Sequence, residues 1–293
     1  MVVGQIGCGV WGAHVLRDLR TLGCDVRVVA RSDASRARAA AGGAGAVVPD
    51  VSGLSGLDAV VVVTPIATHA TLIREALEHD VPVFVEKPLC DDPRDADHLA
   101  ALAPERLFVM DKWRYHPGIR KLAEFAASGS LGRARGLRTI RVQPDNRHAE
   151  DATWVLAPHD LAIALEILGE VPRPVAAAGV RDGEKLVSLH AILETDRGWQ
   201  VIEVSERAAR IERRVELHCD DGLAVLEGAW DEHVAVHTPD GRTERVETPG
   251  ELPLLAELRA FVEHVGGSGP PKSSVGEGAA VVRAIDAMRS LAS

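Results

Sequence analysis

Cysteine is scarce in this sequence, aromatic residues make up only 3% of it, and no long apolar run is present. The four cysteines, Cys8, Cys24, Cys90 and Cys219, lie far apart and form no close ligand pair, so the sequence predicts neither a zinc site nor a disulfide framework. They fit reduced thiols of the cytosol. No apolar run approaches the roughly 20 residues that span a bilayer, and glycines soon interrupt the apolar start at Met1–Ile6. We therefore expect a cytoplasmic protein without a membrane segment.

Basic residues are also in deficit. The chain has 33 Lys and Arg against 43 Asp and Glu, a formal net charge of −10. Such a balance argues against a surface that neutralises nucleic-acid phosphates or anionic lipids. Neither nucleic acid nor a membrane is therefore expected as a partner. The expected partner is a small-molecule substrate.

The first third of the chain alternates short β-branched runs with longer helical stretches, a pattern typical of a parallel sheet covered by helices on both faces. The expected strands are Val2–Ile6, Val26–Ala30, Ala59–Val63, Val81–Val85 and Leu107–Met110. The expected helices are Ala13–Leu22, Ser35–Ala41, Thr68–Glu78 and Pro93–Leu102. Residues 1–112 are thus predicted to form a doubly wound α/β (Rossmann) domain.

The pattern changes after Lys112, which favours a second domain at 113–293 over one large domain. Pro117–Ser128 still reads as a helix, but most of the sequence after it is strand-like. The expected strands are Ala134–Val142, Val175–Arg181, Leu186–Glu194, Gln200–Glu206, Arg213–Cys219, Leu223–Glu227 and His233–His237, with helices at Leu161–Leu168, Leu252–Val265 and Val275–Leu291. Hairpin turns between several strands predict an open, mostly antiparallel sheet in an α+β domain.

A glycine-rich turn follows the first expected strand, with the sequence Gly7-Cys8-Gly9-Val10-Trp11-Gly12. Glycine permits a tight turn and a close backbone approach to a pyrophosphate, and the N-terminus of the next helix favours the anion. The alternative is a turn that only packs the helix on the strand. We interpret Gly7, Gly9, Val10, Trp11 and Gly12 as cofactor contacts.

The end of the second strand selects the dinucleotide in such domains, because an acid there binds the ribose 2′-hydroxyl of NAD. This chain has Arg31-Ser32-Asp33 instead. Arg31 would pair with a 2′-phosphate and Ser32 could donate to it, so the sequence favours NADP. Asp33 keeps NAD open, with Arg31 as an exposed loop residue.

Glu86-Lys87-Pro88 follows the expected strand Val81–Val85. Lys87 is therefore at the carboxyl end of a parallel strand, where open α/β sheets bind ligands, and a lysine there can handle a proton or orient a substrate oxygen. Glu86 is either an ion-pair partner or a solvated charge.

With these motifs in place, the chain resembles the Gfo/Idh/MocA family, named for glucose-fructose oxidoreductase and inositol dehydrogenase. The resemblance rests on the glycine turn and on four further motifs in the first 170 residues, namely Thr64-Pro65…His69, Glu86-Lys87-Pro88, Arg114-Tyr115-His116-Pro117 and Trp154…Pro158-His159-Asp160-Leu161. It implies an active site between two domains, a sheet often used for oligomerisation, and hence a homodimer or homotetramer. It also implies that Thr64, Pro65, His69 and Glu86 line the cofactor site.

The resemblance assigns the catalytic roles to Lys87 and His159, which would act at the carbon that exchanges hydride with the nicotinamide. From the residues alone, His159 reads as a capping or buried histidine near the start of Leu161–Leu168. One departure is that many members have an aspartate four residues before the histidine, where this chain has Val155. Neither Asp151 nor Asp160 is an obvious replacement.

Arg114, Tyr115 and Trp154 are the further candidates for substrate contact, with core packing as the alternative for the tryptophan. No histidine spacing indicates a metal. The expected activity is NAD(P)-dependent hydride transfer to or from a secondary alcohol or ketone of a sugar, cyclitol or sugar-nucleotide. The alternatives are a reductase of an imine or enone and a non-catalytic sensor that binds a dinucleotide or sugar.

Overall fold

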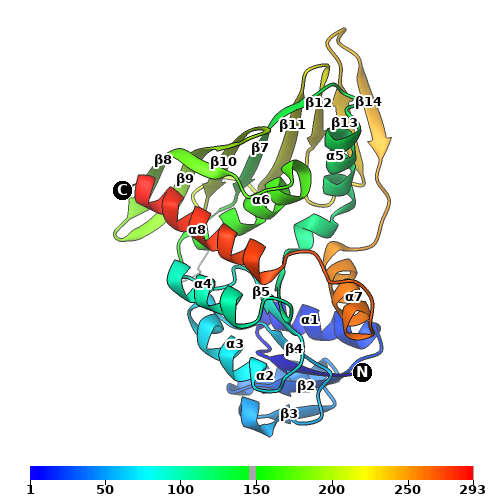
Figure 1. Ribbon diagram of the computed structural model, residues 1–293, viewed down its shortest axis with the longest axis vertical. Coiled ribbons are helices and arrows are strands. Elements are labelled where there is room, and N and C mark those ends of the chain that lie inside the picture. Colours follow the sequence, from blue (N-terminus) through cyan, green and yellow to red (C-terminus); the bar gives the residue numbers. More distant parts are fainter. Residues whose placement is uncertain (145–149, 293) are drawn as a thin grey trace. The chain divides into compact units, whose positions relative to one another are not determined.

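The computed structural model describes residues 1–144 and 150–292, which divide into two units (Figure 1). The first unit contains Met1–Lys112 and Leu252–Val282, and the second contains Trp113–Glu251 and Arg283–Ser293. The sequence assigned everything after Lys112 to one domain, whereas in the structure Leu252–Val282 packs with the first unit. None of the helices in the described ranges is both long and apolar enough to span a bilayer.

Within the described part of the first unit, six parallel strands form a sheet in the order β3-β2-β1-β4-β5-β6. They are β1 Val2–Ile6, β2 Asp25–Val29, β3 Ala46–Val48, β4 Ala59–Val62, β5 Val83–Glu86 and β6 Leu107–Met110. The sequence predicted all of them except β3, and the doubly wound fold is confirmed. Valine dominates the central strands because helices cover both faces of the sheet, so β4 is buried along its whole length.

The helices of this unit are α1 Val10–Thr21, α2 Asp33–Ala41, α3 His69–Leu77, α4 Pro93–Leu102 and α7 Pro253–Val265, with short 3-10 turns η1 Val51–Gly53 and η2 Ile66–Thr68. Side chains cap the starts of α2 and α4, whereas α1, α3 and α7 begin without a side-chain cap within the described residues. At α4, for example, the Asp92 carboxylate accepts from Arg94 N at 2.7 Å, and Pro93 lacks the N–H that would go unpaired.

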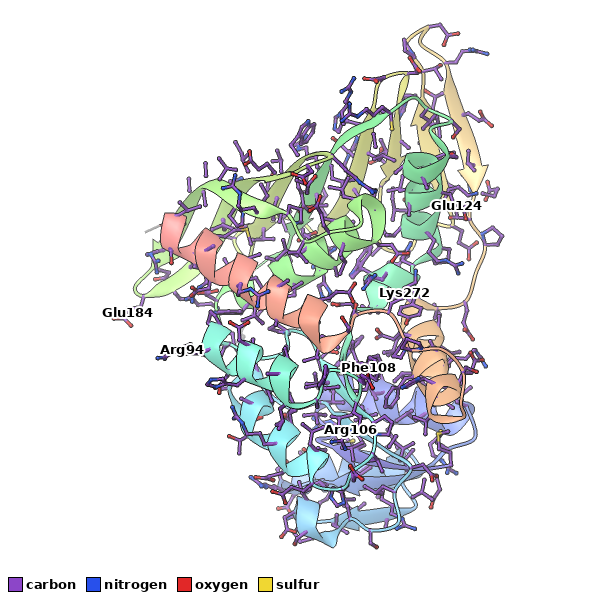
Figure 2. All side chains as sticks on the ribbon, in the orientation of Figure 1. Arg94, Arg106, Phe108, Glu124, Glu184 and Lys272 are labelled. Carbon is purple, nitrogen blue, oxygen red and sulfur yellow. The ribbon has the colours of Figure 1, made fainter. Side chains whose placement is uncertain are left out.

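Helix α7 completes the core of the first unit from far along the sequence. It lies beside α1 (Figure 1), and Phe261 stacks on Phe84 of β5 with ring centroids 4.7 Å apart. Phe108 of β6 lies in the same core (Figure 2), edge to face with His264 at 5.0 Å. The apolar side of α7 therefore covers and buries part of one face of the Rossmann sheet.

In the second unit, eight strands across residues 113–144 and 150–251 form a sheet in the order β14-β13-β12-β11-β7-β10-β9-β8. They are β7 Ala134–Val142, β8 Arg173–Asp182, β9 Lys185–Thr195, β10 Gly198–Ser205, β11 Glu212–Cys219, β12 Gly222–Leu226, β13 His233–His237 and β14 Thr243–Glu247. β7 pairs in parallel with β10, and the other named pairs are antiparallel. The mostly antiparallel sheet is confirmed, although β14 was not predicted.

Helices α5 Pro117–Ser128 and α6 Ala152–Leu168 pack against this sheet, and η3 Lys112–Tyr115 precedes them. The last helix, α8 Val275–Leu291, begins in the first unit and ends in the second. The prediction that a helix starts at Leu161 was wrong. Asp151 caps α6 by accepting from Thr153 N at 3.1 Å, and Pro158 lies inside the helix. His159 is thus mid-helix and is not a capping residue.

Candidate active site

The three glycines of the first turn have different structural roles. Gly7 has φ +99°, and a Cβ there would lie 2.4 Å from the Val63 carbonyl oxygen. A Cβ on Gly12 would lie 2.8 Å from the Gly7 oxygen, but a Cβ on Gly9 would meet nothing within 4 Å. The fold itself therefore requires Gly7 and Gly12, while Gly9 leaves open space at the start of α1.

Gln5 supports this turn from inside β1, and the sequence analysis missed it. Its side chain is fully buried, and its amide nitrogen donates to the carbonyl oxygens of Gly7 at 2.8 Å and Gly12 at 2.9 Å. A lone amide in the apolar run Val2–Ile6 was the available signal. Gly9 caps α1 without a side-chain hydrogen bond, so the first N–H groups of α1 suit an anion such as a pyrophosphate.

The segment after β2 places Arg31 on the surface and Ser32 at the start of α2. The Ser32 hydroxyl accepts from Ser35 N at 3.2 Å and donates to Ser35 Oγ at 3.0 Å. Asp33 pairs with Arg36 at 2.5 Å. The Ser32 hydroxyl thus caps α2, and the Arg31 side chain before it is exposed.

His69 links the end of β4 to the residues after β5. Its ring is 1% exposed, with Nε2 2.8 Å from the Thr64 carbonyl oxygen and Nδ1 2.9 Å from that of Pro88. Burial lowers the pKa of His69, and a neutral imidazole can donate through only one nitrogen. Pro65 accepts from Thr68 N at 2.9 Å. The Thr64–His69 segment therefore supports the backbone around Lys87 through buried hydrogen bonds.

Lys87 lies at the carboxyl end of β5, partly buried, and the Lys87–Pro88 peptide is cis. The neighbouring Glu86 accepts from Trp11 Nε1 at 3.2 Å, and Lys112 Nζ lies 4.2 Å from the centre of the Trp11 ring. Burial raises the pKa of Glu86, and the positive charges of Lys87 and Lys112 oppose that rise. Glu86 is therefore not a fully solvated charge, and the hydrogen bond at 3.2 Å comes from the Trp11 indole rather than from a cation.

A second buried acid, Glu257 of α7, belongs to the same cluster. It is 1% exposed, and within the described residues its Oε2 has no hydrogen-bond partner. Burial raises the pKa of Glu257 well above its usual value, and the charges of Glu86 and Asp111 add to this effect. The sequence could not associate Glu257 with Glu86, because about 170 residues separate them.

In the second unit, His159 lies on the one partly open stripe of α6. Almost every residue of this helix is buried, but Val155, His159 and Glu166 are partly exposed. Their spacing of four and seven residues places them on one face. The His159 ring is 6.5 Å from that of Trp113, which stacks on His116 at 5.2 Å.

The other predicted substrate contacts have structural partners. Arg114 is 9% exposed and pairs with Glu166 at 3.2 Å. Trp154 is 7% exposed, with the Arg289 guanidinium 5.3 Å from its ring. Tyr115 is partly exposed. These contacts position Arg114 and Trp154, and all three residues remain predicted substrate contacts.

Neither aspartate of α6 takes the position of the family carboxylate. Asp151 caps the helix and pairs with Arg289 at 2.8 Å. Asp160 is fully buried and pairs with Arg141 of β7 at 3.2 Å. Val155 is therefore an apolar neighbour of His159 on the open stripe.

Comparison with known proteins agrees with this arrangement. Residues 1–110 match the model of an oxidoreductase family with an NAD-binding Rossmann fold, GFO_IDH_MocA. An inositol 2-dehydrogenase from Paenarthrobacter aurescens is 40% identical over 129 residues, which is 40% of this chain and 39% of that protein. A second, from Saccharopolyspora erythraea, is 27% identical over 96% of this chain and 90% of its own length. The first unit of this chain is thus similar to the Rossmann domain of the Gfo/Idh/MocA oxidoreductases.

Solved structures extend the Gfo/Idh/MocA likeness to the second unit. A UDP-N-acetylglucosamine 3-dehydrogenase from Acidithiobacillus ferrooxidans has a TM-score of 0.86 at 25% identity, covering 99% of this chain and 97% of that one. Two further solved structures, of lower sequence identity, contain a bound dinucleotide. One is an Agrobacterium radiobacter oxidoreductase with NAD+, L-tartaric acid and magnesium, with TM-score 0.88, 17% identity, and 100% and 96% coverage. The other is a 3-ketoreductase from Actinomadura kijaniata with TDP-benzene and NADP, with TM-score 0.87, 23% identity, and 99% and 96% coverage.

Proposed function

We propose that this chain transfers hydride between NADP and a secondary alcohol or ketone of a sugar, cyclitol or sugar-nucleotide. The observation that carries the proposal is the open space at Gly9. Gly9 begins α1 without a side-chain cap, and it lies within the residues that match the family model. A pyrophosphate needs such a start, since any side chain there would occupy the space. A bound nicotinamide would supply or accept the hydride.

Lys87 and His159 are the proposed proton-handling groups. Lys87 follows the end of a parallel strand, and the half-buried Glu86 beside it accepts a hydrogen bond from Trp11 Nε1. His159 lies on the open stripe of α6, where a ring nitrogen can reach a ligand. One group would move the hydroxyl proton and the other would orient the oxygen and stabilise its charge.

Arg31 supports NADP as the cofactor. Its side chain is exposed at the end of β2, where the ribose of a dinucleotide lies in Rossmann domains. No carboxylate stands at this position to repel a 2′-phosphate, because the next acid, Asp33, pairs with Arg36. NAD is the alternative.

The first test is a titration of the purified protein with NADPH and NADH separately, followed by nicotinamide fluorescence. We expect saturable NADPH binding and much weaker NADH binding. A screen of sugars, cyclitols and sugar-nucleotides with the preferred cofactor would then detect turnover. Binding of neither dinucleotide would overturn the proposed function.

The second test removes the proposed catalytic amine. Lys87→Ala should lose turnover by about 10²-fold or more while binding NADPH as the wild type does. Lys121→Ala is the matched control, because Lys121 pairs with the exposed Glu124 of α5 and lies over the Phe125 ring of the same helix. Normal turnover by Lys87→Ala would refute the assignment.

The alternative function, a non-catalytic sensor of a dinucleotide or sugar, is favoured by one observation. Val155 gives His159 an apolar neighbour at the position where the family resemblance implied an aspartate. A sensor would bind NADPH and sugar without turnover of any substrate in the screen.

We further propose a cytoplasmic homo-oligomer. The four cysteines are free thiols. Val180 and Ile192 are 58% and 52% exposed, and the β8–β9 register places them on one face. Ile192→Glu should shift the mass measured by light scattering toward the monomer, and an unchanged mass would exclude this face.

A further inference from the structure

Arg141 of β7 is a buried cation with unused donors. Its side chain is 3% exposed, and its guanidinium carbon lies 4.4 Å from the centre of the Trp113 ring. Its Nε donates to the Asp160 carboxylate at 3.2 and 3.3 Å. In residues 1–144 and 150–292, no acceptor receives the N–H groups of its two terminal nitrogens. Four of the five donors of the guanidinium therefore have no acceptor in the described part of the chain.

A second arginine stands beside it. Arg213 of β11 is the antiparallel register partner of Arg141, so both side chains leave the same face of the sheet. One terminal nitrogen of Arg213 donates to Val142 O at 2.6 Å and Glu212 O at 2.9 Å, and the other donates to Gln143 Oε1. Its Nε has no acceptor among the described residues, and the residue is partly exposed. Arg213 is thus held in place with one donor remaining.

The charges of this cluster do not balance. Among the described residues, two guanidinium groups face one carboxylate, that of Asp160. Burial and the neighbouring Arg141 charge lower the pKa of Arg213 to about 10. Glu212, the nearest acid along β11, is paired with Arg210 at 3.0 Å. An additional anion would relieve the repulsion between the two guanidinium groups and accept hydrogen bonds from their unused N–H groups.

The pair also lies near the candidate catalytic histidine. Trp113 contacts Arg141 on its ring face and has His159 at 6.5 Å between ring centroids. Asp160, the partner of Arg141, directly follows His159 on α6, and Gln200 Nε2 donates to the Asp160 carbonyl oxygen at 2.9 Å. A ligand that reaches His159 can therefore extend to the two arginines.

We propose that Arg141 and Arg213 bind a carboxylate or phosphate group of the substrate. This inference rests on the proposed function and narrows its substrate class to anionic hydroxy compounds, such as a sugar acid or a sugar phosphate, rather than neutral cyclitols. Planar guanidinium groups suit either anion through paired N–H donors.

The test measures binding to the NADPH-saturated protein, so that the glycine turn is already occupied. The probes are D-glucuronate, D-glucose 6-phosphate, inorganic phosphate and, as the neutral reference, D-glucose, each followed by calorimetry. We expect at least one anionic probe to bind tenfold or more tightly than glucose, with an affinity that falls as salt rises. Glucuronate and glucose 6-phosphate distinguish a carboxylate from a phosphate ligand.

Arg213→Gln should weaken that binding tenfold or more, and Arg213→Lys should restore part of it. Arg138→Gln is the matched control, because Arg138 lies on β7, leaves the opposite face of that strand from Arg141, and has its carboxylate contacts at 3.8 and 3.9 Å. Equal binding of anions by wild type and Arg213→Gln, in variants with wild-type melting curves, would overturn the subsite. So would equal binding of glucose and both sugar anions.

The two proposals can fail separately. If the wild type binds NADPH but shows no anion preference, only the subsite is wrong. If it binds no dinucleotide, the proposed function fails, and the effect of Arg213→Gln on anion binding still decides the subsite.

Discussion

Alanine at Gly12 is expected to lower stability, whereas alanine at Gly9 is expected to weaken cofactor binding without lowering stability. In Gly12→Ala the new Cβ would lie 2.8 Å from the Gly7 oxygen, a backbone atom that Gln5 holds at 2.8 Å. Overpacking of this kind costs about 1–3 kcal/mol, and the better helix propensity of alanine returns about 1 kcal/mol. The net loss is therefore up to about 2 kcal/mol, a fall in Tm of roughly 4–8 °C if the unit unfolds like a 150–250-residue domain.

Gly9→Ala should behave in the opposite way. Its φ of −68° suits any L-residue, and the new Cβ meets nothing within 4 Å. The weaker capping by alanine and the reduced entropy of the unfolded chain nearly cancel, so stability should change by less than about 1 kcal/mol. The methyl group would, however, occupy the space proposed for the pyrophosphate and should weaken NADPH binding by about tenfold or more, or about 1.4 kcal/mol.

Both variants are measured by thermal unfolding followed by circular dichroism and by NADPH fluorescence titration. The expected pattern is a normal Tm with impaired binding for Gly9→Ala, and a lowered Tm for Gly12→Ala. Wild-type NADPH affinity in Gly9→Ala would show that the cofactor does not approach this position. A loss of stability equal to that of Gly12→Ala would refute the structural argument.

Four further outcomes are expected. Arg31→Asp should shift preference from NADPH toward NADH, as measured by the ratio of dissociation constants, and an unchanged ratio would remove Arg31 from the 2′-phosphate site. Val155→Asp should favour the charged imidazole of His159 and move the pH–rate profile to higher pH. An unmoved profile would show that a charge at position 155 does not act on His159. Burial raises the pKa of Glu257, so the folded state holds this proton more tightly, and stability falls as pH rises above the ordinary pKa of a glutamate. Glu257→Gln should flatten that fall in Tm with rising pH. Burial raises the pKa of Cys90 to about 12, so iodoacetamide at about pH 8 should leave Cys90 unmodified by mass spectrometry until the protein is unfolded.

The first unit could be predicted because its signals are local. The runs Val2–Ile6 and Leu107–Met110 have the bounds of β1 and β6, since valine-rich strands bounded by turns carry their own pattern. β3 and β14 were missed for a common reason. Ala46–Val48 is short and mostly exposed, and Thr243–Glu247 is largely charged, so both depend on pairing with a neighbouring strand.

Helix α6 shows why the start of an element can be hidden. It is apolar on nearly every face, so its first half has no amphipathic period, and Pro158 suggests a boundary where none exists. The placement of Leu252–Val282 in the first unit was also out of reach, because chain order says nothing about which sheet a late helix covers.

The candidate site divides in the same way. The glycine turn and Lys87 follow from position relative to strands, so the sequence could place them. Three contacts join residues of different secondary-structure elements, and the sequence does not indicate them. They are the hydrogen bonds of Gln5, the Glu86–Trp11 bond and the Arg141–Asp160 pair. At Ser32 the structure adds a capping bond to Ser35 that residue type alone did not indicate, and its phosphate contact stays a prediction.

The late position of α7 has a consequence for synthesis of the chain on the ribosome. Residues 1–112 emerge before the helix that covers Phe84, and the whole of Trp113–Glu251 is made before Phe261 becomes available. At bacterial-type elongation rates that interval is on the order of ten seconds. For that time the nascent sheet exposes an apolar face that α7 later buries, which makes the early Rossmann segment a natural client for chaperones that shield hydrophobic surface.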